Sequence, residues 1–182
     1  MRSRDVDIVM IPGVGGSGPD HWQSRWQAKL PNAYRAEQAD WDRPDLTAWT
    51  SRLVETLARC ERPIVLVAHS LGVTTVVHAA AGTLPTIAGA FLVTPPSDEA
   101  IAEVPGIDPA FRPTPRILLP CPALVVSSRN DPYASADEVA AFASDWGATL
   151  VDAGEAGHVN TESGHGPWPE GLMAFAGFLN RL

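Results

Sequence analysis

The chain has 182 residues, 45% hydrophobic and 19% charged, which is ordinary for a soluble globular protein with its own core. Its formal net charge is −8, which argues against nucleic acid or an anionic membrane surface as a partner. The cysteines, Cys60 and Cys121, form no C-x-x-C pair, so we expect no zinc site, redox motif or cofactor. The charged N-terminus precedes an apolar run too short for a signal or membrane-spanning segment. We therefore expect a cytoplasmic protein with one domain over residues 1–182.

Apolar runs that alternate with helical patterns indicate the order of the elements. Strands are expected over residues 6–11, 64–67, 87–93, 123–127 and 149–151, with a weaker candidate at 32–38. Helices are expected over 45–60, where Asp45 is the candidate N-cap, and over 71–81, 135–146 and 169–182. This alternation predicts a three-layer α/β/α sandwich, with a mainly parallel sheet of about six strands covered on both faces.

The five residues from Ala68 to Gly72 form a small-x-Ser-x-Gly turn directly after the strand expected at 64–67. A strand that ends in this turn and leads into a helix is typical of a nucleophile elbow, which lifts the Ser70 hydroxyl out of the sheet edge. The first position is usually glycine, and alanine is the next smallest residue. The sequence therefore predicts Ser70 as a nucleophile that needs a neighbouring base.

Two further reactive side chains follow strands expected later in the chain. Asp131 comes after the run 123–127 and His158 after the run 149–151, which is the chain order of α/β-hydrolase triads. An imidazole can remove the serine proton near neutral pH, and a buried carboxylate fixes its tautomer. Taken singly, Asp131 before Pro132 is a common turn and His158 is an ordinary surface histidine. The hypothesis therefore depends on the order of the three residues and on their places at strand ends.

Other titratable side chains compete for these roles. His165 is the best alternative base, and His21 is a weaker one. His78 falls within the helix expected after the elbow, where packing is the simpler interpretation. Asp152 is an alternative acid at the end of its own strand.

A tetrahedral intermediate needs two N–H donors for its developing negative charge. We expect one from the backbone of Leu71, directly after the nucleophile, and the other from Val14, with Gly13 as its neighbour in the glycine-rich loop 12–18. This loop has loose G-x-G-x-x-G spacing and no P-loop lysine, so nucleotide binding is disfavoured.

The substrate contacts are less certain from sequence, and Gly13, Trp22 and His69 are the candidates. Three tryptophans, Trp22, Trp26 and Trp41, line an acyl pocket or belong to the core. The proline-rich segment 94–120 is either an ordinary surface loop with a helical turn or part of the substrate rim.

Five motifs together resemble the small serine hydrolases related to retinoblastoma-binding protein 9, the YdeN-like family. They cover essentially the whole chain and lie at residues 12–23 (PGVGGSGPDHWQ), 68–72 (AHSLG), 127–133 (SSRNDPY), 157–160 (GHVN) and 168–171 (WPEG). The resemblance implies a minimal α/β-hydrolase fold without a cap domain and a triad of Ser70, His158 and Asp131. It also implies a carboxylesterase-like activity on small ester substrates.

The chain departs from this family at two points. His165 stands where many related chains have an aromatic residue, which concerns the edge of the pocket. The Leu-x-Cys-x-Glu motif, through which animal relatives bind a retinoblastoma-type protein, is missing, so the protein partner stays open. A silent hydrolase scaffold that acts as a protein-binding module is the alternative function, because a fold alone does not establish activity.

Overall fold

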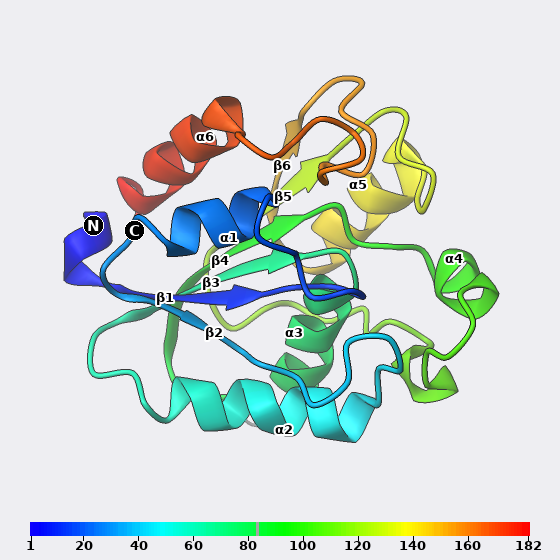
Figure 1. The fold of residues 1–182 in the computed structure, drawn as a ribbon, viewed down its shortest axis with the longest axis horizontal. Coiled ribbons are helices and arrows are strands. Elements are labelled where there is room, and N and C mark those ends of the chain that lie inside the picture. Colours follow the sequence, from blue (N-terminus) through cyan, green and yellow to red (C-terminus); the bar gives the residue numbers. More distant parts are fainter. Residues whose placement is uncertain (83) are drawn as a thin grey trace.

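Six parallel strands form the centre of the computed structural model, which describes residues 1–82 and 84–182 (Figure 1). The strands are β1 (Asp7–Ile11), β2 (Ala33–Arg35), β3 (Ile64–His69), β4 (Ile87–Val93), β5 (Ala123–Ser127) and β6 (Thr149–Asp152). The α-helices are α1 (Trp22–Gln27), α2 (Leu46–Leu57), α3 (Leu71–Ala81), α4 (Asp98–Glu103), α5 (Ala136–Asp145) and α6 (Pro169–Leu179). Two 3-10 turns are η1 (Ser3–Asp5) and η2 (Pro109–Phe111).

Helices cover both faces of the sheet because its central strands are apolar on both sides. In β1 all five residues are buried, and successive side chains point to opposite faces. Ile8 and Met10 pack in the cluster that includes α1 and α6, whereas Val9 and Ile11 pack in the cluster that includes α2, α3 and α5. Figure 1 shows the same division, with α1 and α6 on one side of the strands and α2 and α3 on the other.

The strand order is β2-β1-β3-β4-β5-β6. Successive strands are therefore added first on one side of β1 and then on the other. After β1 the chain moves outward to β2, and it then crosses back to place β3 on the other side of β1. At such a switch point the following segments diverge, which leaves a crevice outside the carboxyl ends of the strands. The loops after β1 and β3 both lie at this edge, and Figure 1 shows α4 at the same end of the molecule.

The observed elements confirm the predicted α/β sandwich, and they differ from the prediction mainly at their ends. The weak candidate at 32–38 forms the edge strand β2, and β3 continues through Ala68 and His69. Asp45 caps α2 as expected, because its side chain accepts from the Ala48 N–H. Helices α1 and α4 were not expected, since six residues are too few to show a helical period. Within the described residues, no helix is long and apolar enough to cross a membrane.

Candidate active site

Ser70 lies at the junction of β3 and α3, in the turn that the sequence predicted. Its backbone has a φ of 54° and a ψ of −131°, a conformation that non-glycine residues seldom adopt and that costs roughly 1–3 kcal/mol. The turn is held on both sides, because the Ser70 N–H donates to the Val93 carbonyl at 3.0 Å and the Val73 N–H donates to the Ser70 carbonyl at 2.8 Å. Ser70 thereby lines a cavity at the edge of the sheet.

Two glycines allow the loop after β1 to pass directly over this turn. A Cβ atom at Gly13 would lie 2.8 Å from the Cβ of Ser70, and one at Gly72 would overlap the carbonyl oxygen of Ile11. Ala68, which replaces the usual glycine, is fully buried in the core cluster beneath α3. Small residues at these positions are therefore a packing requirement of the elbow.

The structure brings the three predicted side chains together at the carboxyl ends of the strands. The Nε2 atom of His158 lies 2.8 Å from the Oγ of Ser70, and its Nδ1 atom lies 3.0 Å from each carboxylate oxygen of Asp131. The side chains of His158 and Asp131 are 8% and 1% exposed, so their contact is shielded from water. When Nδ1–H donates to the carboxylate, Nε2 is free to accept the serine proton, as a general base must.

Side chains from distant elements hold the loop that carries His158. His69 donates from Nε2 to the His158 carbonyl at 2.8 Å, and Trp22 donates from Nε1 to the Val159 carbonyl at 2.9 Å. Val159 has a φ of 48° and is fully buried, an unusual conformation for a β-branched residue. Surrounding bonds must impose this backbone, which directs the imidazole toward Ser70.

The loops that carry Asp131 and His158 are also bonded to each other. Asn130 accepts from the Gly157 N–H at 2.7 Å, and the Ser128 hydroxyl accepts from the Ala156 N–H at 3.0 Å. His158 and Asp131 therefore keep one relative position. Sequence reasoning missed Asn130, although its place beside Asp131 was a usable signal.

Two histidines beside His158 stay uncharged at neutral pH. His21 accepts the Gln23 N–H at Nδ1, and burial lowers the pKa of His21 to about 4, with the charges of Arg35 and His158 adding to the effect. Burial also holds the pKa of His69 well below its usual value, and the same charge on His158 contributes. Ring centroids lie 4.9 Å apart for His21 and His69, and 4.8 Å apart for His69 and His158. Neutral neighbours add no repulsion when His158 takes up a proton.

The two predicted oxyanion donors have free N–H groups beside the nucleophile. Within the described residues, neither the Val14 nor the Leu71 N–H has a protein acceptor. The Cβ position of Gly13 lies 3.2 Å from the Leu71 nitrogen, so the loop after β1 touches the elbow directly. The two backbone segments thus form one concave surface at Ser70.

Arg35 of β2 fixes the second half of this loop. Its guanidinium donates to the carbonyls of Gly16 at 2.5 Å and Ser17 at 3.3 Å, to the Ser24 hydroxyl at 2.7 Å and to the Gln27 amide oxygen at 2.8 Å. Its side chain is only 10% exposed. One buried cation therefore ties the loop to α1, a role that the weak strand pattern gave no means to predict.

A cavity of about 350 Å³ opens over Ser70 and has two chemically different walls. The apolar wall comes from α4 and its flanks and consists of Pro96, Ala100, Ile101, Val104 and Ile107. The polar wall comes from the loop after β6 and from the loop between β1 and α1 and includes Ser17, His21, Asn160, Thr161 and Glu162. Of the two interpretations of segment 94–120, the structure favours the substrate rim.

The competing titratable residues are engaged elsewhere. His165 lines a different hollow beside Trp168, and its Nδ1 lies 3.2 Å from the Ser163 hydroxyl. His78 contacts the Phe111 carbonyl through Nε2 at 2.9 Å. Asp152 pairs with Arg129, whose Nε donates to it at 2.8 Å. Within the described residues, no group of three or more His, Cys, Asp and Glu side chains is arranged to hold a metal ion.

The expectation that Trp22 contacts substrate is wrong, because its side chain is 0% exposed and bonds to the base loop. Trp26 is likewise a core residue on the α1 and α6 side. Trp41 packs under the glycine loop, where its ring leaves no room for a Cβ at Gly16. Of the other two candidates, His69 lines the cavity but is 5% exposed, and Gly13 contacts the elbow.

Comparisons with known proteins agree with this architecture. A family model described as serine hydrolase matches residues 8–177. A YdeN-like hydrolase from Pectobacterium atrosepticum is 34% identical, with 97% of this chain and 91% of that chain covered and a TM-score of 0.86. A comparison with curated proteins gave no match.

Two more distant structures share the fold. The ydeN gene product of Bacillus subtilis is 16% identical, with coverage of 95% of this chain and 98% of that chain and a TM-score of 0.77. Esterase 2 of Thermogutta terrifontis is 18% identical, with coverage of 100% of this chain and 85% of that chain and a TM-score of 0.64. At these identities the likeness concerns the arrangement of the elements.

Proposed function

The chain belongs to the serine hydrolase family, and from that premise we propose that it is a carboxylic ester hydrolase that acts through an acyl-enzyme on Ser70. The observation that carries the proposal is the continuous path from Ser70 Oγ to His158 Nε2, at 2.8 Å, and from His158 Nδ1 to Asp131, at 3.0 Å. The fold shared with an esterase is consistent with this chemistry.

In the acylation step, His158 removes the hydroxyl proton while the Ser70 oxygen attacks the ester carbonyl. Asp131 stabilises the imidazolium that forms and keeps the ring in one orientation. The N–H groups of Val14 and Leu71 bind the oxygen that becomes negatively charged. His158 then gives its proton to the departing alcohol oxygen, which leaves the acyl group on the serine.

In the deacylation step, the same groups act on water. His158 takes a proton from a water molecule, whose oxygen attacks the acyl carbonyl, and the proton returns to Ser70 as the acid leaves. The two free backbone donors serve both tetrahedral intermediates. Because they are already in place, no rearrangement opposes their interaction with the developing charge.

A fluorophosphonate probe and a p-nitrophenyl ester together test the proposal. We expect labelling and turnover in the wild type, and loss of both in Ser70→Ala. His158→Ala should lower turnover by roughly 10³-fold or more, because a general base is lost. His165→Ala is the matched control and should keep near-wild-type turnover, since its ring lines a different hollow.

Three outcomes contradict the assignment in different ways. Equal labelling of the wild type and Ser70→Ala would move the nucleophile. Loss of turnover in His165→Ala with turnover kept in His158→Ala would move the base. A folded wild type that neither reacts with the probe nor hydrolyses esters would favour a silent scaffold that binds a protein partner.

A further inference from the structure

The two walls of the cavity differ in chemistry, and each is joined to a different reacting group. Ile101 and Phe111 pack against Leu71, directly after the nucleophile, so the apolar wall adjoins the elbow. Asn160 and Glu162 come two and four residues after His158, so the polar wall adjoins the base. Figure 1 shows α4 and the loop after β6 apart from each other around the carboxyl ends of the strands.

The direction of proton transfer sets how an ester lies between these walls. The leaving oxygen must come within reach of His158 Nε2, because that atom returns the proton. Residues 160–162 line the same cavity as His158 and follow it in the chain, so we place the leaving group beside them. The carbonyl oxygen binds the N–H groups of Val14 and Leu71. The acyl chain then lies along the α4 side of the cavity.

The α4 wall is a fixed surface suited to a hydrocarbon chain. Ser97 donates its N–H to the Tyr133 carbonyl at 2.9 Å, which links the start of α4 to the loop of Asp131. At the same end of α4, Asp98 accepts from the Thr114 N–H at 3.0 Å and from the Thr114 hydroxyl at 2.6 Å. An acyl chain that lies on this wall buries apolar surface of both the wall and the chain, which favours binding at that position.

The polar wall carries a negative charge and no positive one. Among the described residues that line the cavity, Glu162 is the only Asp or Glu and there is no Lys or Arg. The molecule as a whole has a formal net charge of −8. An anionic leaving group would meet repulsion both at a distance and at contact, whereas a cationic one would be attracted.

We infer that the substrates are esters of an apolar acyl group with a cationic alcohol, the acyl chain lying on the α4 wall and the alcohol beside Glu162. This inference rests on the proposed ester hydrolase function. It assigns specificity to α4 and to the loop after β6. It also disfavours acyl donors with phosphate-bearing leaving groups.

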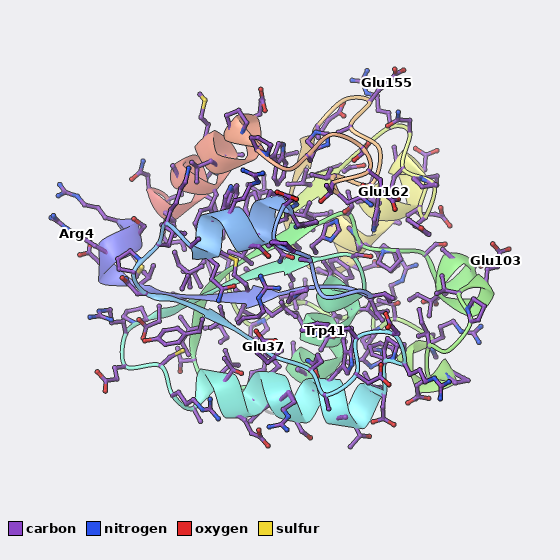
Figure 2. All side chains as sticks on the ribbon, viewed as in Figure 1. Arg4, Glu37, Trp41, Glu103, Glu155 and Glu162 are labelled. Atoms are coloured by element: carbon purple, nitrogen blue, oxygen red, sulfur yellow. The ribbon has the colours of Figure 1, made fainter. Side chains whose placement is uncertain are left out.

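The acyl arm of the test compares two alanines of α4. Ala100 lines the cavity, whereas Ala102 is exposed and lies outside it. Figure 2 shows Glu103, the neighbour of Ala102, pointing away from the body of the molecule. In the wild type, kcat/KM for p-nitrophenyl esters should rise roughly two- to fourfold per methylene from acetate to hexanoate. Ala100→Phe should lower the hexanoate-to-acetate ratio at least about tenfold, and Ala102→Phe should leave it unchanged.

The alcohol arm compares two glutamates of the loop after β6. The substrates are butyrylcholine and its neutral isostere, 3,3-dimethylbutyl butyrate. Glu162→Gln should lower the choline-to-isostere ratio of kcat/KM by roughly threefold at low salt, the scale of an exposed charge interaction. Glu155→Gln is the control, because Glu155 does not line the cavity and Figure 2 shows it at the outer tip of the loop, away from Glu162.

The outcomes separate this inference from the function on which it rests. An inactive wild type that does not react with fluorophosphonate overturns both. An active wild type whose acyl ratio is the same in Ala100→Phe and Ala102→Phe overturns the inference alone, as does a choline ratio that Glu162→Gln leaves unchanged. If Ala100→Phe fails to fold, Ala100→Leu narrows the same wall and should lower the acyl ratio in the same direction.

Discussion

His21 shows how neighbours fix the protonation state of one side chain. Its Nδ1 caps α1 by accepting the Gln23 N–H, and its Nε2 is buried without a partner within the described part of the chain. Burial lowers its pKa from 6.5 to about 4. A histidine whose pKa falls on folding favours the unfolded state when acid is added, because the unfolded chain binds the proton first.

We predict that His21→Asn flattens the dependence of stability on pH. Asparagine can still accept the capping bond, but it does not titrate. Between pH 7 and pH 4 the free energy of unfolding of the wild type should fall by about 3 kcal/mol more than that of the variant. Urea denaturation at the two pH values measures this, and equal losses in both proteins would show that folding does not lower the pKa of His21.

The three side chains that meet at the edge of the sheet could be predicted from sequence, whereas their neighbours could not. Ser70, Asp131 and His158 stand at the ends of apolar runs, and a parallel sheet gathers such ends at one edge. His21 belongs to the site only because its ring lies beside that of His69, far along the chain, with the two centroids 4.9 Å apart. Glu162 lines the cavity because of the conformation of the loop after β6. A loop has no repeating sequence pattern from which this conformation could be predicted.

At the scale of elements, the elbow depends on how closely α3 approaches the end of β1. The contact is possible only because Gly72 has no side chain, since a Cβ there would overlap the Ile11 carbonyl and come within 2.6 Å of the Pro12 carbonyl. Ser70 stands at the start of the same helix. Any shift of α3 therefore moves Ser70 relative to His158.

We predict that Gly72→Ala lowers the free energy of unfolding by at least about 1–3 kcal/mol, as overpacking of a tight contact does, and also lowers kcat. Gly177→Ala in α6 is the matched control, because nothing lies within 4 Å of its Cβ position. There alanine should stabilise the protein by roughly 0.5–1 kcal/mol. Chemical denaturation measures the stability of both variants, and ester turnover measures their activity. Equal stabilities of Gly72→Ala and Gly177→Ala would refute the close contact between α3 and the end of β1.

A second prediction at this scale concerns the link that Arg35 makes between β2, α1 and the glycine loop. Arg35→Met leaves the partly buried Gly16 carbonyl without its side-chain donor and removes one of the two donors to the Ser17 carbonyl, which should cost roughly 1–3 kcal/mol of stability. The loop also carries the Val14 donor, so kcat should fall more than KM rises. Arg52→Met, which removes a half-exposed surface pair with Glu55, should change neither by much.

Element length explains which parts of the fold were predictable. Helix α2 has twelve residues and a capping aspartate, so its pattern and its start were both visible in the sequence. Helices α1 and α4 have six residues each, too few for a period to emerge. The edge strand β2 is only partly buried, so it lacks the continuous apolar run of the central strands.

At the scale of the whole molecule, the sheet joins two cores that share the same strands. Trp26 and Trp168 belong to the core on the α1 and α6 side, and Trp146 belongs to the core on the α2, α3 and α5 side. Because alternate residues of β1, β3, β4 and β5 enter opposite cores, neither core can lose its packing while the other keeps its own. We therefore expect residues 1–182 to unfold as one cooperative unit.

This expectation can be checked by following urea unfolding with tryptophan fluorescence and with far-ultraviolet circular dichroism. The two transitions should coincide in midpoint and in slope, because tryptophans report on both cores and dichroism reports on all elements. Separate transitions would mean that the chain contains two independently stable units.

The two-walled cavity also suggests a route to new catalysts. The segment between β4 and β5 supplies the α4 wall, and it packs on Leu71 through the small apolar cluster that contains Ile101 and Phe111. Replacing the segment between β4 and β5 with a shorter or longer segment from a related enzyme would change the shape of the cavity. The cavity would then accept a different acyl group. A replacement segment would have to keep the packing against Leu71 and the bond from Ser97 to the Tyr133 carbonyl, so that Ser70 and Asp131 stay in place.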